Sequence, residues 1–255
     1  MRLQVSLIVL LCTAAQVHAD TITIRADEWL PYNGPLSRKP PGYMIEMADA
    51  IAATQGHTIE YKTMPWDDAV ASSRKGDIDC VVGALKSDAE GFMFPEESWG
   101  DSLNGLFALT DTDWTYTDIE SFSSVRVAVI AGYSYSEEID AYVEANKADP
   151  NKVVIVNSTG RALMNAVSRL VSRKADVIIE DVNVAASTFA KMNMADRMKS
   201  VGVVGEPEPL YIACTPASPR GKQFADMFSA GTVELRSSGK LAEILEKYGL
   251  EDWKK

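Results

Sequence analysis

Two segments that lie far apart in the chain repeat one pattern, and this repeat constrains the fold more than any other feature. Residues 73–82 read SRKGDIDCVV and residues 172–179 read SRKADVII. Each copy ends a helical stretch with basic residues, which suit the negative end of a helix, and then enters a short apolar run through an Asp. Runs rich in β-branched residues are typical of strands buried on both faces. The sequence therefore predicts two similar α/β lobes.

Each copy closes a longer series of alternating strands and helices. The first series has predicted strands at residues 21–25, 58–64 and 78–83, with helices at 43–55 and 66–75. The second has strands at 126–130, 153–156 and 177–179, with helices at 134–146 and 160–172. Both follow the order β-α-β-α-β, the repeating unit of a parallel sheet. Further strands are predicted at 106–109, 201–204 and 210–214, and further helices at 184–194, 221–237 and 241–248.

The chain is predicted to begin with a secretory signal peptide at residues 1–19. Arg2 supplies a positive charge, residues 5–15 form an apolar core, and Val17-His18-Ala19 is a small-x-small cleavage site. The alternative is a membrane anchor, but the apolar core falls short of the roughly 20 residues that span a bilayer. We therefore expect a soluble, periplasmic product.

The mature chain is long enough for two ordinary domains. The apolar strands at 106–109 and 201–204 are the expected crossings between them. They divide the chain into a discontinuous lobe 1, residues 20–108 plus 207–255, and a lobe 2, residues 109–206. A cleft between two lobes is where small ligands prefer to bind.

Charge and composition exclude several classes of partner. The formal charge of −11 becomes −12 when Arg2 leaves with the signal peptide. This acidity argues against nucleic acid and anionic membrane surfaces. Of the two His residues, His18 lies in the signal peptide, and the acidic residues show no calcium-loop spacing. With no Gly-rich phosphate loop either, we expect neither a metal nor an organic cofactor.

Cys80 and Cys214 are the cysteines that remain after removal of the signal peptide. Both fall in apolar runs that are predicted to be strands. In an oxidising compartment such a pair forms a disulfide, or stays as two buried thiols that behave as small hydrophobes. The sequence leaves both interpretations open.

Several short motifs, in their order and spacing, resemble the family 3 solute-binding proteins, the periplasmic receptors of ABC transporters for polar amino acids. The motifs are GYMIE at 42–46, KGDID at 75–79, FP at 94–95, AGYS at 131–134, ADVIIED at 175–181 and LRSSGKLAEI at 235–244. The resemblance covers essentially all of the mature chain. It implies an α/β, type II periplasmic-binding-protein fold, in which each lobe is a mostly parallel sheet flanked by helices and the lobes close on a ligand. It also implies a monomer whose partner is an inner-membrane ABC permease or a sensor protein.

A second likeness is to a divergent proteobacterial branch of that family. Its motifs correspond here to PW at 65–66, FPE at 94–96 and GYSY at 132–135. In that branch an Arg often follows the Trp by two positions, where this chain has Asp68. The substitution removes a positive charge from the side of the cleft.

Part of the family's amino-acid site is missing from this chain. The family holds the ligand carboxylate with an Arg shortly after the third strand, the geometry at which a guanidinium excels. No Arg occurs between Ala84 and Val125, where Lys86 is the one cation. The Asp that binds the ligand's amino group in the family corresponds to Asp181. The resemblance therefore points to an amine-bearing ligand other than an ordinary α-amino acid.

Residues after the two repeated strands are candidate ligand contacts, because ligands of such sheets lie beyond the carboxyl ends of the strands. Asp181 is the first choice and Glu180 the second, since a buried carboxylate needs a partner, either a ligand ammonium or a neighbouring Lys or Arg. Lys86 is a candidate anion partner or an ordinary solvated Lys. The remaining candidates at these strand ends offer backbone groups and are Gly83, Ala84 and Leu85.

Other candidates lie in loops and at helix starts. Trp29 and Tyr32 belong to a Pro-rich loop after the first strand and are expected to stack on a flat or cationic ligand or to cover the loop. Trp66 either contacts the ligand or packs in the core. Ser134 and Arg161 stand at predicted helix starts, which bind anions. Residues 134–137 also read as a capping box, and Arg161 equally suits the surface.

These features together predict periplasmic capture of a small polar, amine-bearing solute for an ABC importer, without catalysis. One alternative is a ligand-sensing receptor domain for a signalling partner. Another is a lyase similar to cyclohexadienyl dehydratase. The lyase needs a general acid, and a carboxyl group that titrates far above its ordinary pKa would be its sign.

Overall fold

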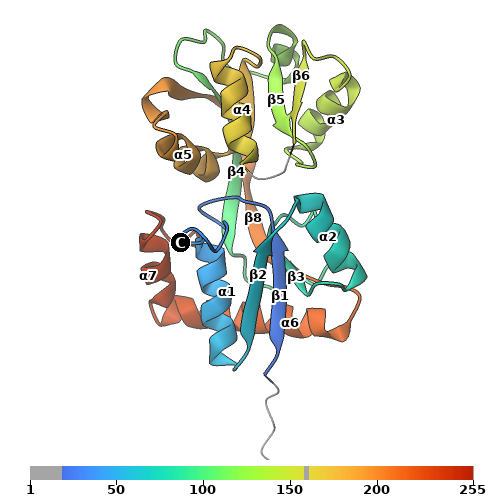
Figure 1. The fold of residues 1–255 in the computed structure, drawn as a ribbon, viewed down its shortest axis with the longest axis vertical. Coiled ribbons are helices and arrows are strands. Elements are labelled where there is room, and N and C mark those ends of the chain that lie inside the picture. The colour runs from blue at the N-terminus through green and yellow to red at the C-terminus, as the bar shows by residue number, and fades with distance from the viewer. Residues whose placement is uncertain (1–18, 158–160, 255) are drawn as a thin grey trace, which may run out of the picture.

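The computed structural model describes residues 19–157 and 161–254, and it has two lobes that are joined by two long strands (Figure 1). Most of the predicted signal peptide lies outside the described residues. The first series of elements is β1 (Thr21–Ala26), α1 (Tyr43–Thr54), β2 (Thr58–Thr63), α2 (Trp66–Lys75) and β3 (Cys80–Ala84). The second is β5 (Val127–Ile130), α3 (Glu137–Asn146), β6 (Val153–Val156), α4 (Ala162–Val171) and β7 (Val177–Asp181). Both follow the predicted order.

The remaining helices extend the two lobes. α5 (Val182–Lys191) follows β7 directly, while α6 (Pro219–Ser237) and α7 (Lys240–Glu246) pack against α1 of the first series. We call the first series with α6 and α7 lobe 1, and the second series with α5 lobe 2. Two short 3-10 turns, η1 (Ile119–Ser124) and η2 (Ala195–Arg197), complete the described elements.

β4 (Gly100–Leu109) and β8 (Met198–Cys214) run from one lobe to the other and make one eight-stranded sheet in the order β2-β1-β3-β8-β4-β7-β5-β6. Within each series the strands are parallel, whereas β4 and β8 pair antiparallel to each other and to their neighbours. Because Asn104 to Phe107 already pair with β7, β4 enters lobe 2 before the expected boundary at residue 108.

β8 corrects one sequence prediction. Two separate strands were expected at 201–204 and 210–214, because Pro207 and Pro209 interrupt the apolar pattern between them. The structure has one continuous strand. Pro209 pairs with Asp101 of β4, and β3 joins β8 only from Tyr211 onward. Where a strand has a partner on one side alone, a Pro is tolerated if its nitrogen, which carries no hydrogen, faces away from that partner.

The sequence repeat has a structural role at the start of each inner strand. The Asp79 carboxylate accepts hydrogen bonds from the backbone N–H and the hydroxyl of Thr23, at 2.9 and 2.8 Å. In lobe 2 the Asp176 carboxylate accepts them from the backbone N–H and the guanidinium of Arg126. Each Asp thus ties the strand that follows it to its parallel neighbour, which aligns Cys80 with Ile24 and Val177 with Val127.

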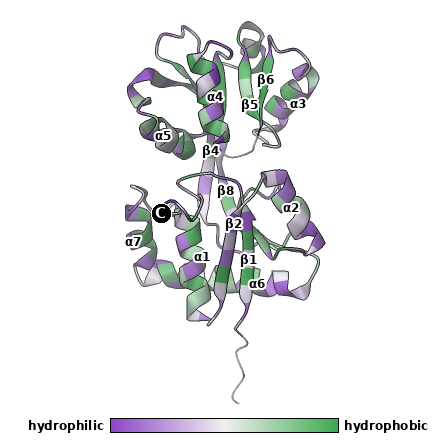
Figure 2. Ribbon diagram, in the orientation of Figure 1, coloured by the Kyte–Doolittle hydropathy of each residue, from purple (hydrophilic) through white to green (hydrophobic). Residues whose placement is uncertain are grey.

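The cores lie between the sheet and the helices. In α1, Met44, Met47 and Ile51 recur on one face and are almost fully buried, as the helical spacing of apolar residues predicts. Figure 2 shows hydrophobic residues concentrated in strands such as β1 and β5, and hydrophilic residues on helices such as α2. None of the described helices has both the length and the apolarity that crossing a bilayer requires.

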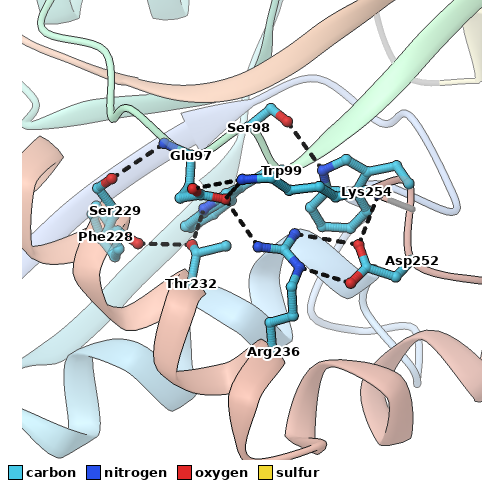
Figure 3. A network of polar contacts seen from close by, with 10 residues as sticks. Glu97, Ser98, Trp99, Phe228, Ser229, Thr232, Arg236, Asp252 and Lys254 are labelled. Atoms are coloured by element: carbon cyan, nitrogen blue, oxygen red, sulfur yellow. Dashed lines mark hydrogen bonds and ion pairs between the residues drawn. The ribbon is translucent and has the colours of Figure 1, made fainter.

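Two kinds of cross-link stabilise lobe 1. Cys80 of β3 and Cys214 of β8 form a disulfide, which is one of the two interpretations that the sequence left open. The C-terminal segment is held by ion pairs, because Arg236 of α6 contacts both Glu97 and Asp252, and Lys254 also contacts Glu97 (Figure 3). These contacts fasten the end of the chain onto the segment that leads into β4.

Candidate ligand-binding cleft

A cavity of about 50 Å³ lies between the lobes, where the carboxyl ends of β1, β3, β5 and β7 converge. Lobe 1 contributes Asp27, Trp29, Trp66, Val82, Gly83, Leu85 and Asp88. β4 contributes Ser102 and Asn104, and lobe 2 contributes Tyr133, Ser134 and Glu180. Ligands of open α/β sheets bind at this edge, beyond the carboxyl ends of the strands. The cavity is therefore the candidate binding site.

Glu180 is the central charged residue of this cavity. Its side chain is only 2% exposed. Oε1 accepts hydrogen bonds from Trp29 Nε1 at 2.8 Å and from the backbone N–H of Asp181 at 2.9 Å. Oε2 is buried and has no hydrogen-bond partner among the described residues. Burial, joined by the nearby charges of Asp181 and Asp27, raises the pKa of Glu180 to about 8, although the hydrogen bonds from Trp29 and the Asp181 N–H work against this shift.

Two more carboxyl groups line the same cavity. Asp27 follows β1, and its Oδ2 accepts a hydrogen bond from the Tyr133 hydroxyl of the opposite lobe. Burial raises the pKa of Asp27 to about 6, although the Tyr133 hydrogen bond works against this shift. Asp88 accepts a hydrogen bond from the backbone N–H of Leu85, and burial raises its pKa to about 6 as well. No Lys or Arg of the described chain lines this cavity.

The structure gives Asp181 a structural role, while its predicted ligand contact stays a prediction. Its carboxylate is fully buried and does not line the cavity. Oδ1 caps α5 by accepting from the backbone N–H groups of Asn183 and Val184, and Oδ2 accepts from the Ser102 hydroxyl and the Leu103 N–H. The helix starts at Val182 and not at the predicted residue 184, so Asp181 becomes its N-cap.

The three predicted aromatic residues lie at the cleft, in different roles. Trp29 and Trp66 line the cavity. Tyr32 lies behind Trp29, with their ring centroids 4.6 Å apart. The Tyr32 hydroxyl is 3.1 Å from both carboxylate oxygens of Asp181 and accepts a hydrogen bond from the Asn183 side chain. Tyr32 therefore supports Trp29 and joins the two lobes, without lining the cavity.

The residues after β3 divide in the same way. Gly83 and Leu85 line the cavity, whereas Ala84 is buried and does not. Gly83 has a φ of 82°, and a Cβ there would stand 3.1 Å from Asn33 Oδ1 and 3.4 Å from the Trp29 ring. A glycine is therefore needed for both its backbone conformation and its close contacts. Lys86 is exposed, with its ammonium 5.1 Å from the Tyr211 ring centroid, and it does not line the cavity.

The predicted helix starts also differ from expectation. Ser134 lines the cavity, but α3 begins at Glu137 and is capped by Ser136, while the Ser134 hydroxyl donates to Asp140. Arg161 precedes α4 and lines a neighbouring pocket, together with Arg38 and Lys191. Residues 158–160, which belonged to this predicted helix start, lie outside the described residues.

The neighbouring pocket shares Tyr133 and Glu180 with the cavity, but cations line it as well. These are Arg38, Arg161 and Lys191, and its other acidic residue is Glu28. Arg161 and Lys191 are exposed. The pKa of Lys191 is lowered mainly by desolvation. The charges of Arg38 and Arg161 also lower it. An acidic cavity and a basic pocket therefore meet at Glu180.

Sequence reasoning missed Asp27, Asp88, Asn104 and Tyr133. Asp27 follows β1 and Tyr133 follows β5, so the rule about carboxyl ends, applied to these two strands as well, would have found both. Asp88 lies in a turn closed by Leu85, and Asn104 lies inside a strand. Neither carries a pattern in the sequence that distinguishes it from surface polar residues.

No group of three or more His, Cys, Asp or Glu side chains in the described part of the chain is arranged to hold a metal ion. The three carboxyl groups of the cavity are thus spread around its wall and not gathered on one point.

Comparisons with known proteins agree with this geometry. Residues 22–90 match the family model for bacterial extracellular solute-binding proteins, family 3. The resemblance to family 3 is confirmed over these residues. A search of curated proteins finds no match.

The whole described fold is similar to solved structures of type II periplasmic binding proteins. An ancestral arginine-binding protein bound to arginine has a TM-score of 0.72 at 20% identity, covering 89% of this chain and 97% of its own. A substrate-binding protein of an ABC uptake transporter from Streptococcus pneumoniae, with bound histidine, has a TM-score of 0.73 at 20% identity, covering 91% and 93%. A histidine kinase sensor domain similar to periplasmic binding proteins has a TM-score of 0.70 at 19% identity, covering 89% and 95%. At these identities the similarity establishes the fold.

Proposed function

We propose that this protein captures a small polar solute bearing an amine between its two lobes and presents it to an ABC-type importer. One observation carries the proposal: Glu180 presents a buried carboxylate oxygen, without a partner among the described residues, in a cavity whose walls come from both lobes. An isolated buried carboxylate is unfavourable unless a partner compensates for its lost hydration. A ligand ammonium is such a partner.

Hydrogen bonds across the cleft explain how binding and closure are coupled. Trp29 of lobe 1 donates to Glu180 of lobe 2, and Tyr133 of lobe 2 donates to Asp27 of lobe 1. A ligand between these pairs contacts both lobes only when they are closed. Its extra contacts further stabilise the closed form, which these hydrogen bonds already favour in the empty protein and which is the form that a partner recognises. β4 and β8 cross between the lobes and provide the hinge.

The comparisons support the cellular setting of this proposal. The matched family is described as extracellular, and one structural neighbour is the substrate-binding protein of an ABC uptake transporter. We place the mature protein in the periplasm, as a monomer, after removal of residues 1–19. Its partners are the small solute and an inner-membrane permease, with no nucleic acid and no cofactor involved.

A thermal-shift screen tests the proposal. The mature protein is heated with amino acids, amines, organic acids and nucleosides in turn. A ligand at a hundred times its Kd adds about 2.7 kcal/mol of stability, which is readily seen as a raised melting midpoint. We expect amine-bearing compounds to raise the midpoint of the wild-type protein.

Two matched variants locate the binding site. We expect the shift to be lost in Glu180→Gln and kept in Glu206→Gln, which removes the same charge from an exposed position on β8. Stabilisation by organic acids alone, or an equal shift in both variants, would contradict the proposal.

A receptor role uses the same binding event with a different partner. The similarity to a histidine kinase sensor domain favours it as the second candidate. The two roles differ in what the closed form contacts, so deletion of the gene separates them. Loss of solute uptake supports transport, whereas unchanged uptake with a lost transcriptional response supports sensing.

A lyase role is the third candidate, and the pKa of Glu180 is the observation that favours it. With a pKa of about 8, Glu180 is largely protonated at neutral pH and could act as a general acid. The cavity lacks a described cation to hold an acidic substrate, which weighs against that role. Incubation with a cyclohexadienyl acid, followed by NMR, decides the question, since turnover would displace the binding-protein proposal.

A further inference from the structure

We infer that the ligand's amine carries no neighbouring carboxylate, so that the cavity selects amines over the corresponding α-amino acids. This inference rests on the proposed function, amine capture at Glu180, and specifies its substrate class. Three features carry it: surplus acceptors, donors that are already engaged, and the absence of a described cation in the cavity wall.

With its carboxyl groups ionised, the state that a bound ammonium favours, the cavity has more acceptors than donors. Glu180 Oε2 is buried without a partner among the described residues. Asp27 and Asp88 add two more carboxyl groups to the wall. Such a surface is satisfied by a ligand that donates hydrogen bonds, as ammonium and amidinium groups do.

The side-chain donors of the wall are mostly engaged within the protein. Trp29 donates to Glu180, Ser102 to Asp181, Asn104 to the backbone of Tyr135, Tyr133 to Asp27 and Ser134 to Asp140. Trp66 is the exception, since its indole N–H has no hydrogen bond within the described chain. A single neutral N–H does not compensate for the charge of a buried carboxylate, which normally takes two or three hydrogen bonds or a bidentate Arg.

An α-carboxylate would therefore meet an unfavourable environment. It is two bonds away from the ammonium nitrogen, so an amino acid that binds through its amine at Glu180 must place both groups in the same cavity. There the carboxylate faces Asp27 and Asp88, whose own raised pKa values reflect how poorly this site accommodates negative charge. Removing the carboxylate from the ligand removes this penalty and keeps the amine contact.

The cations of the neighbouring pocket do not change this conclusion. Arg38, Arg161 and Lys191 stand beyond Glu180, and Arg161 and Lys191 are exposed to solvent. The charges that act most strongly on Glu180 are those of Asp181 and Asp27, which are both negative. A carboxylate next to the bound amine thus lies among like charges, and the exposed Arg161 and Lys191, which water screens, contribute little.

Matched pairs of ligands test the inference. Each pair consists of an α-amino acid and the amine that its decarboxylation gives: histidine with histamine, phenylalanine with phenethylamine, ornithine with putrescine, lysine with cadaverine, and arginine with agmatine. Calorimetric titration of the mature protein gives a Kd for each compound. In every pair with a measurable member, we expect the amine to bind at least tenfold more tightly. We also expect Glu180→Gln to weaken that amine at least tenfold, while the exposed control Glu206→Gln leaves it unchanged.

The outcomes separate this inference from the proposed function. An amino acid that binds as tightly as its amine overturns the inference and leaves amine capture standing, with a cation of the neighbouring pocket as the carboxylate partner. Binding that is the same in Glu180→Gln and wild type overturns the assignment to this cavity. If no member of any pair binds, the proposed amine capture itself fails.

Discussion

The buried carboxyl group of Glu180 should make the stability of the empty protein fall as pH rises. Burial raises its pKa from 4.5 to about 8 in the folded protein. Between these two values the folded state binds more protons than the unfolded chain, so the free energy of unfolding decreases with increasing pH. The contribution is fully present below the unfolded value and is lost as pH passes through the folded value.

The size of the effect follows from the shift. One pKa unit corresponds to 1.36 kcal/mol, so the full shift of Glu180 amounts to about 5 kcal/mol, of which about 2.5 kcal/mol falls between pH 6 and pH 9. These are upper limits, because opening of the lobes would hydrate the carboxylate. For a chain of this size, the loss lowers the melting midpoint by roughly 5–10 °C. Asp27 and Asp88, with pKa values of about 6, act mainly below this window.

The assay is thermal unfolding of the ligand-free protein at half-unit steps from pH 6 to pH 9. Glu180→Gln keeps the size and one acceptor of the side chain but cannot titrate. We expect the midpoint of the variant to change far less across this range than that of the wild type, and the variant to be the more stable protein at pH 9. Parallel curves for the two proteins would show that Glu180 is hydrated, and they would refute its burial between the lobes.

Three further predictions concern residues that hold the framework. Arg236→Met should destabilise the protein by about 1–3 kcal/mol in urea unfolding, because it breaks a partly buried network. The same change at Lys240, whose ion pair is exposed, should have an effect below about 0.5 kcal/mol. Reduction of the disulfide between Cys80 and Cys214 should lower the free energy of unfolding by about 2–4 kcal/mol. A melting midpoint that is the same with and without reductant would contradict that bond. Asp181→Ala should lower stability by about 1–2 kcal/mol through loss of the α5 cap but keep amine binding, and loss of binding at unchanged stability would restore Asp181 as the ligand contact.

The alternation of strands and helices could be predicted from the sequence because it depends on local patterns. In α1 the apolar residues recur at helical spacing, and in β5 every residue is buried, as an uninterrupted apolar run indicates. β8 was not recognised as one strand, because its prolines interrupt the pattern. Whether a Pro is tolerated in a strand depends on which neighbour is present at that position, which is a tertiary property.

The location of the site could be predicted, but not the role of each residue. The rule about carboxyl ends led to Glu180 and Asp181, and the side chains of adjacent residues point in different directions. Which of them faces the cavity depends on where α5 begins, and this differs by two residues from the predicted start. An Asp directly before a helix is a favoured N-cap, so a capping analysis of residues 181–184 would have favoured Glu180 for the ligand. The contacts across the cleft, such as Tyr133 with Asp27, depend on the closed arrangement of the lobes.

The pKa of Glu180 with and without a bound amine tests the central claim most directly. It is measured from the carboxyl ¹³C resonance that is absent in Glu180→Gln, titrated for the empty protein and for the complex with an amine that raises the melting midpoint. We predict a pKa near 8 in the empty protein and a fall of two units or more in the complex, because the ammonium stabilises the ionised carboxylate. A ligand that stabilises the protein and leaves this pKa unchanged would bind elsewhere, and it would contradict the assignment of Glu180 as the amine partner.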